Sequence, residues 1–97
     1  MASSQDYLQY VLDLLRYVPN VTYKKMMGEY LLYVDAVLFG GVYDNRFLVK
    51  KTPSTLAYGL KEVSPYPGAK MMLVVDNENP FEVEKLVRQV IEDLHKQ

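Results

Sequence analysis

The chain has 97 residues, of which 49% are hydrophobic and 24% charged, with no cysteine and a formal net charge of −1 at pH 7. This length and composition fit one globular domain, which we expect to span residues 1–97. Without cysteine the chain forms neither a disulfide nor a thiolate zinc site, and its near-zero charge does not attract phosphate or an anionic membrane over the whole surface.

The first predicted element is a helix over residues 4–17. Ser3 or Ser4 can accept a hydrogen bond from the first helical turn, and Pro19 ends the helix. Apolar residues recur at helical spacing along one face: Leu8, Val11, Leu12, Leu15 and Val18. A second stripe lies beside the first and contains Tyr7, Tyr10, Leu14 and Tyr17. The polar sector of this helix is therefore narrow.

Strands are predicted next over residues 29–34, 37–43 and 46–51. The turns Asp35-Ala36 and Asp44-Asn45 are short enough to force antiparallel pairing of these strands. Ala36 is a weak point if the turn needs positive φ, because a non-glycine residue there costs about 1 kcal/mol. Gly40-Gly41 inside the second strand indicates a bulge.

The second half of the chain reads as a short helix, two strands and a final helix. Thr52 and Pro53 favour the start of a helix over 53–60. Residues 63–66 resemble an edge strand, and 69–75 form an apolar strand. Asn79-Pro80 begins the last helix, whose expected buried face contains Val83, Leu86, Val87, Val90, Ile91 and Leu94.

The predicted order is therefore α-β-β-β-α-β-β-α. Hairpins flanked by helices predict an α+β fold in which an antiparallel sheet carries the helices in two layers.

The run from Tyr23 to Asp35 carries a resemblance to a known family. Lys24 or Lys25 is followed by Met26, Gly28, Tyr30 and Asp35, in the manner of a basic-x-Met-Phe-Gly-Gly-Tyr-Gly segment, a strand and an Asp-Gly turn. This pattern resembles the N-terminal domain of TfoX/Sxy proteins, bacterial regulators of competence genes. The chain departs from it at Met27, Glu29, Leu31 and Ala36.

Similarity to the family continues through 44–50, including Lys50, and through 65–66 and 70–75. The resemblance implies the same order of helices and strands, and a co-regulator that assists a transcription activator. Family members carry a further C-terminal helical domain, which we expect to be absent because the sequence stops at Gln97.

Catalytic and metal sites find no support in the sequence. His95 is the only histidine, and the carboxylates are scattered over turns and helix faces. We therefore expect no enzyme activity, no metal and no cofactor. There is also no secretion signal and no apolar run of about 20 residues, so we expect a cytoplasmic protein without membrane contact.

The lysine pairs 24–25 and 50–51 raise the possibility of nucleic-acid binding. In the predicted meander they lie at opposite ends of the sheet, about 20 Å apart, so we do not expect direct binding to nucleic acid. A nucleic-acid-binding regulator and a small-molecule-binding domain remain the alternatives.

A protein-binding surface is the favoured interpretation. The strands are apolar at both parities, so both faces of the sheet need cover that the helices need not supply. The expected contact residues lie on the first helix and the sheet: Tyr7, Tyr10, Tyr17, Met27, Tyr30, Leu32 and Met72. We predict a homodimer or a complex with another protein, unless two layers of helix enclose the sheet.

Overall fold

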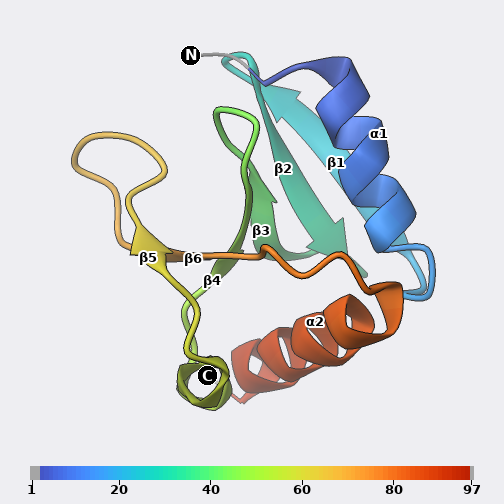
Figure 1. The fold of residues 1–97 in the computed structure, drawn as a ribbon, viewed down its shortest axis with the longest axis vertical. Helices are drawn as coiled ribbons and strands as arrows, with labels where there is room; N and C mark the ends of the chain where they lie inside the picture. Colours follow the sequence, from blue (N-terminus) through green and yellow to red (C-terminus); the bar gives the residue numbers. More distant parts are fainter. Residues whose placement is uncertain (1–2, 97) are drawn as a thin grey trace.

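The computed structural model describes residues 3–96 and contains two α-helices, a 3₁₀ helix and six strands. In chain order the elements are α1 (Gln5–Leu14), β1 (Val21–Met26), β2 (Glu29–Val34), β3 (Val37–Val42), β4 (Phe47–Lys50), η1 (Pro53–Tyr58), β5 (Glu62–Val63), β6 (Met72–Val74) and α2 (Pro80–His95). The strands form one antiparallel sheet in the order β1-β2-β3-β4-β6-β5. Figure 1 shows this arrangement.

Both α-helices contribute to one hydrophobic core with one face of the sheet. Its buried residues include Leu8, Val11, Leu14, Leu15 and Val18 from the α1 region, Val83, Leu86, Val87 and Val90 from α2, and Leu32, Phe39, Phe47, Val49 and Leu73 from the sheet. In Figure 1 α1 lies to the right of the sheet and α2 below it, while the loop from β5 to β6 projects to the left. The α+β fold with two layers is confirmed, and the helices do not enclose the sheet.

Two-residue turns with left-handed backbone join the first four strands. Both predicted turns are present, and Asp35 and Ala36 have φ of 49° and 68°. A third such turn, Met27-Gly28, joins β1 to β2. This geometry matches the right-handed twist of paired strands, so each turn sets an antiparallel hairpin.

The β1 strand corrects the predicted order, which had three strands before the second helix. Five of its six residues are exposed at the sheet edge, so no buried face leaves a period-2 pattern. The Met27-Gly28 turn, with glycine in second position, is the local signal for this hairpin.

Other boundaries also differ from the prediction. The first α-helix stops at Leu14, three residues early, and continues as a hydrogen-bonded turn. The second helix is 3₁₀ and shorter, over Pro53–Tyr58. The two last strands are shorter than expected, at Glu62–Val63 and Met72–Val74.

The helix starts follow the expected capping residues. The Ser4 hydroxyl accepts a hydrogen bond from the Tyr7 N–H at 3.1 Å, and the Asn79 side chain accepts one from the Phe81 N–H at 2.9 Å. Each cap satisfies a backbone donor that the helix leaves unpaired.

The predicted bulge lies at the middle of the sheet. The pairing of β2 with β3 shifts register between Leu32 and Tyr33, which leaves Phe39 as the extra residue next to Gly40. A Cβ atom at Gly40 would overlap the backbone oxygen of Leu48 and lie 3.0 Å from the Val49 Cα. Only glycine therefore permits this approach of β3 to β4.

Candidate functional site

The sheet face that points away from the helices is the candidate site. Side chains alternate along a strand, and Leu32 and Val49 belong to the core, so Leu31 and Lys50 point to the opposite face. Cross-strand pairing extends this face to Met72, which is opposite Lys50. We call this surface the open face; its partly exposed residues include Leu31, Tyr33, Leu38, Tyr43, Lys50, Met72 and Val74.

Two tyrosines form a pair on the open face, close to the turn that joins β3 to β4. The Tyr43 ring lies over Gly41, where an added Cβ would come within 2.7 Å of the Tyr43 Cε2 atom. Tyr66 reaches it from the loop over residues 64–71, with ring centroids 6.5 Å apart and planes tilted by 49°. Burial, followed by the nearby Tyr66, raises the pKa of Tyr43 above its usual value. The Tyr43 hydroxyl is therefore neutral near pH 7 and can donate a hydrogen bond.

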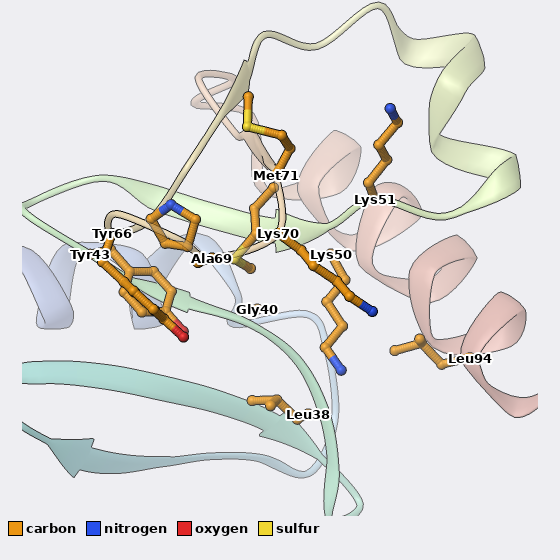
Figure 2. Close-up of a pocket in the computed structure, with 12 residues that line it drawn as sticks. Leu38, Gly40, Tyr43, Lys50, Lys51, Tyr66, Ala69, Lys70, Met71 and Leu94 are labelled. Carbon is orange, nitrogen blue, oxygen red and sulfur yellow. The ribbon is translucent and has the colours of Figure 1, made fainter.

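A hollow of about 440 Å³ lies on one side of this tyrosine pair. We call it the basic hollow, because Lys50, Lys51 and Lys70 line it and no acidic residue does. Leu38, Met71, Met72 and Leu94 contribute apolar surface. Figure 2 shows the side chains of Lys50 and Lys70 reaching into the hollow, whereas Lys51 extends away from it.

The three lysines differ in their charge partners. The Nζ atom of Lys51 lies 3.0 Å from the Glu62 Oε1 atom in a salt bridge. Within residues 3–96, neither Lys50 nor Lys70 forms a salt bridge. Two uncompensated positive charges therefore line one concave surface.

A second hollow, of about 650 Å³, lies on the other side of the tyrosine pair. We call it the apolar hollow; it is lined by Met26, Met27, Leu31 and Glu29 together with Tyr43, Pro65 and Tyr66. The carboxylate of Glu29 accepts hydrogen bonds from the Ser3 hydroxyl at 2.6 Å and from the Asp44 N–H at 3.1 Å. Glu29 thus ties the N-terminal segment to the turn after β3, and its charge is the only acidic one in this lining.

The prediction of Tyr30 and Leu32 as partner-binding residues is wrong. Both lie in the core beneath the helices, with 6% and 0% of their surface exposed. Their strand is apolar at both parities, and the side that the helices cover is the one carrying Tyr30, Leu32 and Val34.

The other predicted contact residues fall into two separate groups. Met27, which is 96% exposed, and Met72 line the two hollows of the open face. Tyr7, Tyr10 and Tyr17 lie on the α1 side of the molecule, where their rings already have partners. Tyr7 and Tyr10 are 5.5 Å apart between centroids. Tyr17 stacks on Phe81 of α2 at 4.6 Å.

The residues of the recognised motif are also dispersed. Lys25 pairs with Tyr30 on the helix-covered face, whereas Met26 and Lys50 belong to the open face. Gly28 and Asp35 lie in turns, with φ of 81° and 49°. The motif residues therefore relate mainly to the geometry of the hairpins, and they do not gather in a single binding site. The lysine pairs 24–25 and 50–51 lie on β1 and at the end of β4, with β2 and β3 between them.

Sequence reasoning missed Tyr43, Tyr66 and Lys70 as site residues. They meet because the loop over 64–71 folds back against the sheet, which no periodic pattern encodes. The Pro67-Gly68 turn, with Gly68 at φ 85°, was the available signal that this segment reverses direction.

His95, the only histidine of the sequence, lines neither of the two hollows. His95 is exposed in the last turn of α2. Across positions 3–96, no group of three or more histidine or acidic side chains is placed to hold a metal ion. In the same part of the chain, no helix is long and apolar enough to cross a membrane.

Comparison with known proteins identifies the family of this chain. The model of the TfoX N-terminal domain family matches residues 13–96. A protein of Spirochaeta aurantia, described as an uncharacterized 12.7 kDa protein in the trpE 5′ region, is 38% identical over 79 residues, which cover 79% of this chain and 69% of that protein. The chain therefore belongs to the TfoX N-terminal domain family.

Proposed function

We propose that this chain is a non-catalytic protein-binding domain that acts as a regulator through contact between its open face and another protein. The observation that carries the proposal is the one-sided placement of the helices. The opposite face keeps two hollows, one of which extends to Leu94 at the end of α2. It also carries several exposed or partly exposed methionine and tyrosine side chains, including Met71, Met72 and Tyr66. Methionine and tyrosine suit interfaces, because methionine adapts its shape and tyrosine combines apolar area with a polar tip.

Charge favours a different protein over a second copy of this chain. A two-fold dimer through the open face would place the same patch on both sides of the interface. The interface would then bury Lys50 and Lys70 from each copy, and the only acidic side chain in the linings of the two hollows is one Glu29 per copy. Like-charge contacts oppose association, whereas a partner with acidic groups would be attracted.

The family supplies the regulatory part of the proposal. TfoX proteins are regulators of competence genes, and the resemblance implies a co-regulator that assists a transcription activator. A domain that binds protein without catalysis suits such a role. A small-molecule-binding role is the second candidate, supported by the basic hollow, since about 440 Å³ is within the range of small-ligand sites.

The test is affinity capture of the tagged chain from its native cell lysate with nuclease present. The informative variant is Met72→Asp, which places a charge on the open face outside the core. The matched control is Leu56→Asp on η1, where leucine is 62% exposed and away from both hollows. Both variants should keep the helical circular dichroism signal and a cooperative thermal transition.

The proposal expects a stoichiometric protein partner that Met72→Asp loses and Leu56→Asp retains. A partner retained by both variants would contradict the assignment of the open face. Release of a small ligand from the purified chain on denaturation, without a protein partner, would support the second candidate.

A further inference from the structure

The two hollows together specify the chemistry of the partner. We infer that the open face recognises a protein segment carrying an acidic residue close to a bulky apolar one. The acidic side chain occupies the basic hollow between Lys50 and Lys70, and the apolar side chain fills the apolar hollow. This inference rests on the proposed function and assigns the partner of the same surface.

The acidic preference follows from the two lysines of the basic hollow. Lys50 and Lys70 both line the hollow, reach into it in Figure 2, and have no salt bridge within residues 3–96. Lys50 is also partly buried, so its charge is less hydrated than that of a free surface lysine. A carboxylate compensates both charges and can also accept a hydrogen bond from the neutral Tyr43 hydroxyl.

The apolar preference follows from the composition of the other hollow. Apolar surface in this hollow comes from the flexible side chains of Met26 and Met27 and from the branched side chain of Leu31. Met26 is 46% exposed and Met27 is 96% exposed. Covering such area with an aliphatic or aromatic side chain removes it from water, which is favourable in proportion to the area. Methionine also adapts to the shape of the group that it contacts.

Glu29 determines which of the two hollows the acidic residue of the partner occupies. Its carboxylate lies in the lining of the apolar hollow and repels a second anion there. The acidic group of the partner is therefore directed to the Lys50 side. A strand of nucleic acid, which needs phosphate contacts along its length, is disfavoured by the same carboxylate.

The hollows are close enough for one segment to occupy both. They share Tyr43, Pro65 and Tyr66, so the tyrosine pair is the wall between them. An extended chain advances about 3.3 Å per residue, so a few residues are enough to pass over an aromatic side chain. We therefore expect the acidic and apolar residues to be separated by about two to four positions.

The experiment is a selection of random 12-residue peptides displayed on phage against the full chain, with counter-selection on the Met72→Asp variant. The inference expects enriched peptides to carry aspartate or glutamate within four positions of a large apolar residue. The binding of one such peptide, measured by fluorescence anisotropy, should weaken about 3- to 10-fold in Lys50→Gln and in Lys70→Gln. Lys85→Gln on α2, which is exposed and outside both hollows, is the matched control and should bind normally.

A charge swap separates a specific contact from general attraction. In Lys70→Glu the peptide should bind more weakly, and replacing the acidic residue of the peptide by lysine should restore part of the loss. Enriched peptides without acidic residues would overturn the inference, as would equal binding by the Lys50→Gln, Lys70→Gln and Lys85→Gln variants. Preferential binding of inorganic phosphate or single-stranded RNA over every selected peptide would overturn it as well.

Failure of the inference differs from failure of the proposed function. If lysate capture depends on Met72 but on neither Lys50 nor Lys70, the open face binds protein and only the acidic chemistry is wrong. If capture is indifferent to Met72, the proposed function itself fails.

Discussion

Replacing Ala36 by glycine should stabilise the protein. Ala36 lies in the turn between β2 and β3 with φ of 68°, beside Asp35 at 49°. Both values belong to the left-handed region that this tight hairpin turn requires. In that region the Cβ atom of alanine lies too close to the backbone, which destabilises the turn, whereas glycine has no Cβ atom.

The size of the effect is the difference between two opposing terms. Left-handed backbone costs a residue with a Cβ atom roughly 1–2 kcal/mol, which the glycine variant recovers. Glycine also makes the unfolded chain more flexible, which costs about 0.4–1 kcal/mol. Ala36 is exposed, so its methyl group contributes little packing. The expected net gain is about 0.5–1 kcal/mol, or roughly 2–6 °C in Tm for a domain of this size.

The assay is urea and thermal unfolding followed by far-ultraviolet circular dichroism. Ala57→Gly is the matched control, because Ala57 is exposed in η1 and is not among the positive-φ residues. The control should lose about 0.5–1 kcal/mol, since glycine is unfavourable inside a helix. Both variants replace an exposed alanine by glycine, so changes of opposite sign in the free energy of unfolding would follow from the backbone geometry at the two positions. A loss of stability in Ala36→Gly comparable to that in Ala57→Gly would refute the turn conformation.

Three further predictions concern the bulge in β3, the hydrophobic core and the contact between η1 and α2. Gly40→Ala should destabilise the sheet by several kcal/mol and broaden the unfolding transition, because its Cβ atom meets the backbone of β4; an unchanged urea midpoint would contradict the bulge geometry. Leu32→Asp should abolish cooperative folding, seen as loss of amide dispersion by NMR, because it buries an unpaired charge; a soluble, folded variant would place Leu32 outside the core. The nearby Thr52 hydroxyl, followed by the backbone N–H and hydroxyl of Ser54, lowers the pKa of Asp93. The ionised Asp93 therefore stabilises the fold above the ordinary carboxyl pKa, and this stabilisation is lost as pH falls below about 4. Asp93→Asn should therefore unfold at a lower temperature at pH 7, with the difference from the parent shrinking toward pH 3; a constant difference across this range would exclude the linkage.

Local signals in the sequence predicted much of the fold because they act over a few residues. Ser4 and Asn79 are recognisable as caps, since each offers a side-chain acceptor immediately before an apolar periodic run. The turn at Asp35 was predictable because aspartate favours turns. The bulge beside Gly40 was predictable because glycine inside a strand often marks a bulge. These features depend little on the rest of the chain.

Contacts between distant segments could not be predicted in the same way. In β2 the residues at both parities are apolar, so the sequence does not say which side the helices cover. The partner-binding assignment of Leu32 failed for this reason. The β1 strand was missed because its pairing to β2 buries almost no side chain.

The candidate site was only partly predictable. Met27 and Met72 stood out as soft apolar side chains, and both line the open face. Tyr43, Tyr66 and Lys70 are brought together by the loop over 64–71, which is a tertiary contact without a periodic signature.

The most direct test of the central claim is methionine footprinting of the captured complex. Brief treatment with hydrogen peroxide converts accessible methionine to the sulfoxide, which mass spectrometry locates in each peptide. Met26, Met27, Met71 and Met72 all line the hollows of the open face. The account predicts that these methionines oxidise in the isolated chain and are protected together in the complex. Equal oxidation of all four in the free and bound chain would contradict the assignment of the open face as the binding surface.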